Sequence, residues 1–186
     1  MEKNKIRKIG FFGGASWVKG NQTYEDSYNV AKLLAENGYE VVNGGGPGVM
    51  RAATNGAHDG GGKVLAVTYH PNKPKKNYEG VDKENLFDEE VYTLDYFDRT
   101  KVMLQNTDLH IIFNGATGTI SEFGMTWASS RIHEGNNKPI ILFGSFWEEL
   151  IKDFQKHMNL RPGEVDLLKI CATPQEVLSY IKSLNR

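Results

Sequence analysis

Short apolar runs alternate with longer segments of helical period along most of this 186-residue chain. Residues 9–12 (IGFF) have the length and composition of a buried strand. Residues 23–36 follow, and their apolar positions recur every three or four residues until Asn37-Gly38 ends the pattern. The same alternation predicts further strands at residues 39–42, 64–67, 91–94, 109–113, 139–142 and 168–170, and further helices at residues 49–57, 96–105, 120–132, 146–157 and 174–184.

Alternation of strands and helices predicts parallel strands joined by right-handed crossovers, with helices on both faces of one sheet. The expected fold is therefore α/β and Rossmann-like, a doubly wound and mostly parallel sheet. A chain of this length fits one domain, so we expect residues 1–186 to form a single Rossmann-like domain. Residues 71–85 are the one long stretch without an apolar period, and we expect a mobile loop with no chemistry of its own.

Composition adds a charge balance and a single cysteine to this picture. Lys plus Arg number 22 and Asp plus Glu number 23, so the formal net charge is -1. This balance argues against a nucleic-acid partner, but a small phosphorylated ligand needs only one local anion site. Cys171 cannot form an intrachain disulfide and fits a reducing compartment. No apolar run approaches the length of a membrane span or a signal peptide, so we expect a cytoplasmic protein without a membrane partner.

Two glycine-rich clusters come directly after predicted strands and directly before predicted helices. They are NGGGPGVM at residues 43–50 and NGATGTISE at residues 114–122. In an open α/β sheet such loops lie at the carboxyl edge, where ligands bind, and the N–H groups of the following helix favour an anion there. The candidate phosphate-binding residues are Gly13 after the first strand, Gly44, Gly45 and Gly46 in the first cluster, and Gly115, Thr117, Gly118 and Thr119 in the second.

Either cluster alone is about as consistent with a tight strand-to-helix turn as with a ligand site. Both clusters are expected on the same edge of the sheet, and the second adds two threonine hydroxyls, which favours a phosphate site. Neither cluster has the Gly-Lys-Ser/Thr of a Walker A loop, and neither matches the GxGxxG pattern of a dinucleotide site. We therefore expect a small phosphorylated ligand rather than a dinucleotide cofactor.

Glu122 and Arg99 are the two charged residues expected beside the second cluster. Glu122 falls in the first turn after it, where a carboxylate often serves only to cap a helix. About seven residues of helix after Arg99 cover roughly 10 Å, and the five residues of the next strand cover roughly 16 Å. The chain therefore leaves the carboxyl edge near Arg99 and returns to it near Asn114. We expect Arg99 and Glu122 to face one another across the phosphate loop.

A carboxylate and a guanidinium beside a bound nucleoside phosphate suit cleavage of an N-glycosidic bond. That reaction passes through an oxocarbenium-like transition state, whose positive charge a carboxylate stabilises directly or by attack on C1′. The guanidinium holds the sugar or the phosphate and keeps the carboxylate ionised. Arg99 and Glu122 are therefore the candidate catalytic residues.

These residues together resemble a known family. GGGPGVM at residues 44–50, GGGKVLAV at residues 60–67, Arg99 with Met103, and GATGTISE at residues 115–122 are similar to the motifs of the Lonely Guy proteins. Those proteins are cytokinin-activating nucleoside 5′-monophosphate phosphoribohydrolases, long mislabelled as lysine decarboxylases. The resemblance extends over residues 9–142, in the order and spacing that the family shows.

The resemblance implies a Rossmann-like nucleotide-binding fold that releases a free base and ribose 5-phosphate without a metal or an organic cofactor. It also implies a homodimer, for which the helices around Met103 and Trp127 are the expected paired surface. Two positions depart from the motif Pro-Gly-Gly-x-Gly-Thr-x-x-Glu, because this chain has Asn114 for the proline and Ala116 for the second glycine. The family's Arg-Lys pair appears as Arg99 followed by threonine.

Other interpretations remain open or are rejected. A related branch of the superfamily resembles molybdenum-cofactor carrier proteins, which bind a phosphorylated pterin without hydrolysis, so a non-catalytic carrier is the alternative. Lysine decarboxylation is rejected because no lysine lies in a loop that suits a pyridoxal phosphate. Trp127 and Met103 either flank a base or belong to the core, as helical spacing more often indicates. Structural or surface roles are expected for the histidines without metal-ligand spacing, which are His70, His110 and His133.

Overall fold

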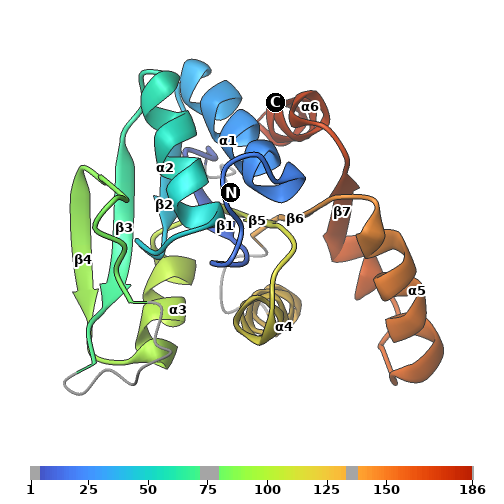
Figure 1. Cartoon of the computed structure of the whole chain (residues 1–186). Helices are drawn as coiled ribbons and strands as arrows, with labels where there is room; N and C mark the ends of the chain where they lie inside the picture. Colours follow the sequence, from blue (N-terminus) through green and yellow to red (C-terminus); the bar gives the residue numbers. More distant parts are fainter. Residues whose placement is uncertain (1–4, 72–79, 133–137, 186) are drawn as a thin grey trace.

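The computed structural model describes residues 5–71, 80–132 and 138–185, and it contains one seven-stranded sheet with helices on both faces (Figure 1). The strands are β1 Lys8–Phe12, β2 Glu40–Asn43, β3 Val64–Tyr69, β4 Glu89–Thr93, β5 Leu109–Ile112, β6 Ile140–Phe143 and β7 Leu168–Cys171. The helices are α1 Gln22–Glu36, α2 Val49–Asp59, α3 Tyr96–Gln105, α4 Thr117–Ile132, α5 Phe146–His157 and α6 Pro174–Leu184, with a short 3₁₀ helix, η1 Val165–Leu167, before β7. Every element that the apolar pattern predicts is present, with its ends within about three residues of the predicted positions.

Neighbouring strands of the sheet are all parallel, in the order β4-β3-β2-β1-β5-β6-β7. In the centre of the sheet, Gly10 of β1 lies between Val42 of β2 and His110 of β5. This confirms the Rossmann-like α/β class, and the described strands are parallel throughout rather than mostly parallel. Strands β3 and β4 are neighbours in both sequence and space, and the described part of their connection contains no helix.

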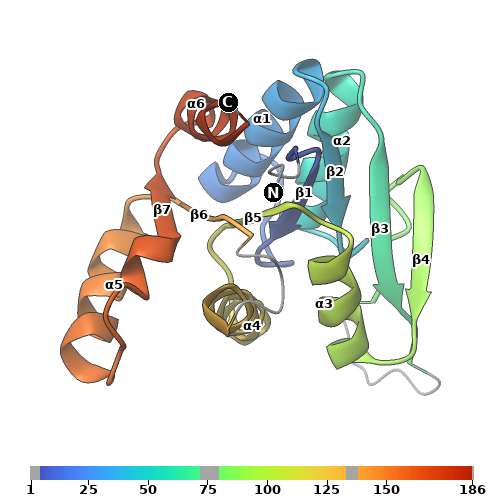
Figure 2. The same ribbon diagram turned by 180° about the vertical axis from the view of Figure 1, so that it is seen from behind.

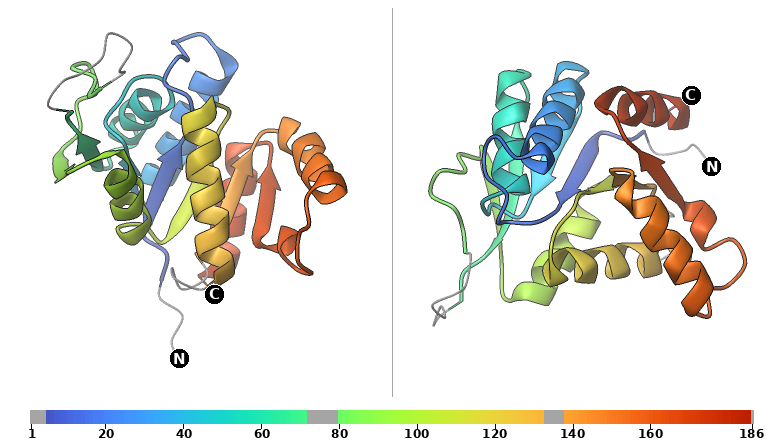
Figure 3. Two further views of the ribbon diagram at one scale, coloured as in Figure 1. Left: turned by 90° about the horizontal axis from the view of Figure 1, so that it is seen from below. Right: turned by 45° about the vertical axis from the view of Figure 1, so that its right-hand side comes forward.

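Helices α1, α2 and α6 cover one face of the sheet, and α3, α4 and α5 cover the other (Figures 1 and 2). Successive side chains of a strand point to opposite faces, so Phe11 of β1 joins the apolar cluster under α1, α2 and α6, while Phe12 joins the cluster on the other face. On that second face α4 lies between α3 and α5 (Figure 3). Burial on both faces explains why the strands read as continuous apolar runs.

The direction in which strands are added to the sheet reverses between β1 and β5. Strands β2, β3 and β4 extend the sheet on one side of β1, whereas β5, β6 and β7 extend it on the other. The chain therefore leaves β1 and β5 toward helices on opposite faces of the sheet, and in open α/β sheets a ligand crevice forms at this point, outside the carboxyl ends of the strands. The second predicted glycine cluster follows β5 and so lies at this crevice.

The start of α4 is the boundary that the sequence pattern placed least well. The helix begins at Thr117, so Thr117, Gly118 and Thr119 form its first turn instead of a loop. Glycine and threonine are weak helix formers, which is why the pattern starts the helix late. Across residues 5–71, 80–132 and 138–185, no helix combines the length and the apolar character needed to cross a bilayer.

Candidate active site

A cavity of about 300 Å³ opens at the carboxyl edge of the sheet, beside the loops after β1 and β5. Its volume is at the lower end of the range for small-ligand pockets. Strand β1 and the loop after it contribute Phe11, Phe12, Gly13, Gly14, Ala15 and Ser16 to the wall, and the loop after β2 and the start of α2 contribute Gly44 and Met50. Helix α3 contributes Tyr96, Arg99 and Met103, and the start of α4 contributes Ala116, Gly118, Thr119 and Glu122. Gly80 completes the lining.

Six of the ten predicted site residues line this cavity, namely Gly13, Gly44, Arg99, Gly118, Thr119 and Glu122. The other four lie nearby but face elsewhere. The carbonyl of Gly45 accepts from the N–H of Asp82 at 3.0 Å, and the carbonyl of Gly46 accepts from Nδ2 of Asn85 at 2.8 Å. Both glycines therefore hold the chain segment after residue 80, and Thr117 is exposed at the first position of α4.

Gly115, the fourth of these residues, joins two loops of the ligand edge. A Cβ at this position would lie 2.6 Å from the nitrogen of Gly14 and 2.1 Å from Oγ1 of Thr119. The N–H of Gly14 donates to the carbonyl of Asn114 at 3.0 Å, and the indole N–H of Trp17 donates to the same oxygen at 2.9 Å. Glycine is required at position 115 because the loops after β1 and β5 approach so closely.

The first turn of α4 directs backbone N–H groups toward the carboxyl edge. Hydrogen bonding along the helix begins with the N–H of Ile120, which donates to the carbonyl of Ala116 at 3.1 Å, so the N–H groups before it have no partner within the helix. Thr119 is buried at this turn. Free donors and the partial positive charge of a helix N-terminus favour an anion. The phosphate site at this turn stays a prediction, and the geometry there suits it.

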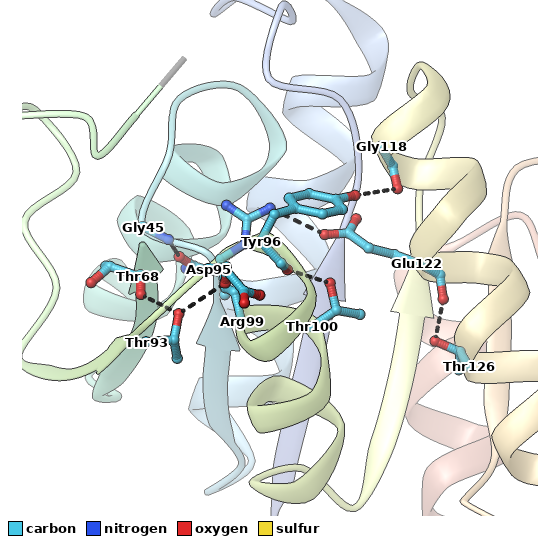
Figure 4. Close-up of polar contacts among 11 residues, drawn as sticks. Gly45, Thr68, Thr93, Asp95, Tyr96, Arg99, Thr100, Gly118, Glu122 and Thr126 are labelled. Carbon is cyan, nitrogen blue, oxygen red and sulfur yellow. Dashed lines mark hydrogen bonds and ion pairs between the residues drawn. The ribbon is translucent and has the colours of Figure 1, made fainter. Parts of the chain in front are cut away.

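Arg99 of α3 and Glu122 of α4 face one another, as the lengths of the intervening helix and strand predicted (Figure 4). Nη2 of Arg99 lies 3.5 Å from Oε1 of Glu122, and both side chains are largely buried, at 17% and 10% exposed. Glu122 lies in the second turn of α4, and its carboxylate points to Arg99 rather than back to the helix N-terminus (Figure 4). The alternative in which Glu122 is a capping residue therefore does not describe this arrangement.

The Arg99 guanidinium compensates only part of the cost of burying the Glu122 carboxylate. Burial raises the pKa of Glu122 from 4.5 to about 7, and the neighbouring Arg99 guanidinium offsets only part of that rise. Charge-assisted hydrogen bonds are typically about 2.7–2.9 Å long, so the 3.5 Å contact is a loose one. Nε of Arg99 is buried and has no hydrogen-bond partner among the described residues. A ligand oxygen at this position can therefore satisfy a donor that the protein leaves unused.

The loop after β1 contributes more of the cavity wall than the sequence reasoning anticipated. Gly13 was the only candidate there, yet Gly14, Ala15 and Ser16 also line the cavity. The signal that identified the other two clusters, glycine directly after a strand, is present here as well and could have identified this loop. Gly80, from the stretch expected to be a loop without chemistry of its own, also lines the cavity, whereas residues 72–79 lie outside the described part of the chain.

Tyr96 is the functional candidate that the sequence reasoning missed altogether. It is the first residue of α3, and its hydroxyl donates to the carbonyl of Gly118 at 3.4 Å. Its ring centroid lies 5.3 Å from Cζ of Arg99, within the range of a cation–π contact. The two residues are three positions apart on a helix and so share one face, which was visible in the sequence.

Of the two candidates for contact with a base, Met103 lines the cavity and Trp127 does not. Met103 is buried in the core and also lines the cavity, so both of its possible roles are compatible with its position. The ring of Trp127 stacks on Phe123, and its indole N–H donates to the carbonyl of Glu164 at 2.8 Å, so it belongs to the packing around α4.

The described histidines show no arrangement for a metal. Over the described residues, no three or more His, Cys, Asp or Glu side chains are grouped in a way that could hold a metal ion. His70 stacks on Tyr92, and His110 is buried in β5, where it shares a hydrogen bond of 2.9 Å with Oγ1 of Thr107. His133 lies outside the described residues.

Comparisons with known proteins find relatives over nearly the whole chain. The model of the SLOG cluster4 family matches residues 6–170. A probable cytokinin riboside 5′-monophosphate phosphoribohydrolase of Oryza sativa subsp. japonica is 32% identical over 169 aligned positions, covering 88% of this chain and 69% of that protein. A cytokinin riboside 5′-monophosphate phosphoribohydrolase of Arabidopsis thaliana is 24% identical over 191 aligned positions, covering 98% of this chain and 85% of that protein. The molybdenum cofactor binding protein of Rippkaea orientalis shares the fold, with a TM-score of 0.72 at 23% identity over 99% of this chain and 100% of that one.

Proposed function

The chain belongs to the SLOG cluster4 family, and we propose on this premise that it hydrolyses the N-glycosidic bond of a nucleoside 5′-monophosphate to a free base and ribose 5-phosphate. The observation that carries the proposal is the buried pair of Arg99 and Glu122, which lines a small cavity beside the N-terminus of α4. Relatives named as phosphoribohydrolases in rice and Arabidopsis support the same class of reaction.

In the proposed complex, the 5′-phosphate lies against the first turn of α4. The donors available there are the free N–H groups of the turn and the side chains of Thr119 and Arg99. The base occupies the part of the cavity lined by Met50 and Met103, where polarisable thioethers suit contact with an aromatic ring. This orientation brings C1′ of the ribose toward the carboxylate of Glu122.

During the reaction, the bond between C1′ and the base nitrogen breaks with its electron pair on the base, which takes up a proton. The oxygen of a water molecule bonds to C1′ and gives up a proton, so the products are the neutral base and ribose 5-phosphate. The transition state carries positive charge near C1′, which the ionised carboxylate of Glu122 stabilises. Arg99 holds the phosphate or the ribose and favours the ionised form of Glu122.

The raised pKa of Glu122 gives the proposed mechanism a defined pH dependence. A carboxylate that must be ionised is active above its pKa and inactive below it. Because kcat/KM reports on groups of the free protein, it should rise with pH and level off above about 7, the pKa of Glu122. If Glu122 acted instead as a general acid, kcat/KM would fall over the same range.

The deciding experiment is incubation with a panel of nucleoside 5′-monophosphates, followed by chromatography of the free base. Glu122→Gln should lower kcat by roughly 10²-fold or more with little change in nucleotide affinity, because the lost interaction is made mainly in the transition state. Arg99→Ala should weaken binding and turnover together. Glu149→Gln, on the exposed surface of α5, is the matched control and should behave as the wild type.

Two results would contradict parts of this proposal. Wild-type protein that binds a larger phosphorylated ligand tightly but releases no base from any nucleotide would indicate the carrier alternative. Wild-type turnover that survives Glu122→Gln would refute the mechanism and leave the activity intact. A crystal grown with AMP should show its phosphate at the first turn of α4, and a phosphate bound elsewhere would exclude this anion site.

We also propose that the chain forms a homodimer through α4. Met103 and the ring of Trp127 pack within the chain, so a paired surface on the two expected helices must use their exposed positions, and we place it on α4. Ile120, Gly124 and Ala128 are exposed there, and no charged side chain lies on α4 between Thr117 and Arg131 except the buried Glu122. A helix with so little charge on its exposed side is suited to burial against a partner.

A further inference from the structure

We infer that Tyr96 is a positioning residue: its ring holds the Arg99 guanidinium beside Glu122, and its hydroxyl ties that ring to the first turn of α4. The inference rests on the proposed function, because it assigns a role within the same site. Figure 4 shows the ring between the Arg99 side chain and the turn that contains Gly118.

The start of α3 holds Tyr96 in a fixed place at the edge of the cavity. Asp95 is the N-cap residue of the helix, and its side chain accepts from the N–H of Asp98 at 2.8 Å. The carbonyl of Tyr96 accepts from Oγ1 of Thr100 at 3.4 Å, within the same turn. The backbone of Tyr96 is therefore held by a capped helix rather than by a free loop, and Arg99 follows three residues later on the same face.

The guanidinium of Arg99 is packed in the cavity wall but has few other polar contacts. Its contact with the carboxylate of Glu122 is 3.5 Å long, and its Nε has no hydrogen-bond partner among the described residues. An arginine side chain has several freely rotating bonds, so one loose contact does not define its orientation. The aromatic face of Tyr96, 5.3 Å from Cζ, is the second contact that limits where the guanidinium can lie.

The hydroxyl of Tyr96 connects this contact to the proposed anion site. It donates to the carbonyl of Gly118 across the mouth of the cavity, which links α3 to the first turn of α4. Residue 118 is exposed, and a Cβ there would lie 3.6 Å from the Tyr96 hydroxyl, so the approach does not depend on glycine at this position. The 3.4 Å bond is at the long end of the range, so we assign most of the positioning to the ring and a smaller part to the hydroxyl.

If Tyr96 positions Arg99, replacing Tyr96 must change the pKa of Glu122, because the charge of Arg99 lowers that pKa. The groups facing Glu122 from α3 are Arg99 and Tyr96, and the described lining residues from the loops after β1 and β2 carry no titratable side chain. If the ring is lost and the guanidinium moves away, the pKa of Glu122 rises. If the ring only excludes water, its loss admits water and the pKa of Glu122 falls. The two explanations differ in sign.

The experiment compares Tyr96→Leu with the conservative Tyr96→Phe in the full chain. Tyr92→Leu is the matched control, because Tyr92 is an exposed tyrosine of β4 that does not line the cavity. The pKa of Glu122 is measured by ¹³C NMR of labelled glutamate carboxyls, with the Glu122 signal assigned from its absence in Glu122→Gln. Kinetics with a nucleoside 5′-monophosphate provide the second readout, and thermal unfolding verifies that each variant is folded.

In Tyr96→Leu, we expect the pKa of Glu122 to rise by about half a unit or more and kcat/KM to fall roughly 5- to 20-fold, the range that a partly buried cation–π contact supports. Tyr96→Phe should keep the wild-type pKa and lose no more than about 3-fold in rate, since it retains the ring. An unchanged or lowered pKa in Tyr96→Leu, or an equal rise in Tyr96→Phe, would overturn the inference. If the wild type releases no base, the proposed function fails, while the NMR titration still decides the role of Tyr96.

Discussion

Replacing Glu122 by glutamine should make the protein more stable at alkaline pH and have little effect at acid pH. The reason is that folding places a carboxyl group of pKa 4.5 in surroundings where its pKa is about 7. Between these two values the folded protein binds more protons at this group than the unfolded chain does. The group therefore lowers the free energy of unfolding as pH rises through this window, and glutamine, which cannot ionise, removes that effect.

The size of the effect follows from the same two values. Ionising Glu122 in the folded protein costs about 3 kcal/mol more than in the unfolded chain, at ~1.4 kcal/mol for each unit between 4.5 and about 7. At pH 5 the unfolded carboxyl is already mostly ionised, so about 2–3 kcal/mol of this cost develops between pH 5 and pH 8. The advantage of Glu122→Gln over the wild type should therefore grow by about 2–3 kcal/mol over that interval.

Urea unfolding of the wild type and Glu122→Gln at pH 5, 6, 7 and 8 measures this difference directly. With a slope of about 2 kcal/mol per M, the separation of the two midpoints should increase by about 1 M between the ends of the series. Loss of packing or of a hydrogen bond at position 122 changes stability equally at every pH, so it cancels when the pH values are compared. Glu149→Gln is the control for an exposed carboxylate and should show no such growth.

If the difference between the urea midpoints of Glu122→Gln and the wild type stays constant with pH, the argument that Glu122 is ionised against a desolvation cost is refuted. A separation that shrinks with rising pH would show that the Arg99 guanidinium outweighs burial, so that the pKa of Glu122 lies below 4.5 rather than above it. In that case the proposed plateau of kcat/KM would move to acid pH as well.

Three further outcomes test other parts of the structure. Burial lowers the pKa of His110 from 6.5 to about 3, so protonation at acid pH favours the unfolded chain. Between pH 7 and pH 5 the free energy of unfolding, measured in urea, should therefore fall by about 2 kcal/mol more for the wild type than for His110→Gln. Gly115→Ala should lower the free energy of unfolding by about 1–3 kcal/mol, since its Cβ meets Gly14 and Thr119. Gly118→Ala should be nearly neutral in the same assay, because its Cβ would lie 3.6 Å from the Tyr96 hydroxyl. Gly124→Glu should abolish the proposed dimer in light scattering and leave the thermal stability of the monomer intact, because a Cβ at position 124 meets no atom within 4 Å. Gly124→Ala is its control. A wild-type mass of about 21 kDa at all concentrations would exclude the dimer.

The sequence determined the elements and their approximate ends because apolar period is a local property. Residues 109–113 are apolar at almost every position, as expected for a strand buried on both faces, and the structure has β5 there. That Arg99 and Glu122 lie at the same edge of the sheet was also predictable, since it depends only on the rise of a helix and of a strand between fixed ends. Distances along regular elements can be worked out without knowing how those elements pack.

The packing angle between α3 and α4 was not accessible in this way, and it decides several features of the site. Whether the hydroxyl of Tyr96 reaches Gly118 depends on that angle, and the two residues are far apart in the chain. The sequence also left open which side of α4 Glu122 occupies, because apolar and small polar residues are mixed around this helix and no polar stripe marks its exposed face. Taken alone, Glu122 was better explained as a capping residue, and only the expected position of Arg99 favoured a place in the site. Only the tertiary structure, by turning Glu122 into the cavity, gives it a pKa of about 7.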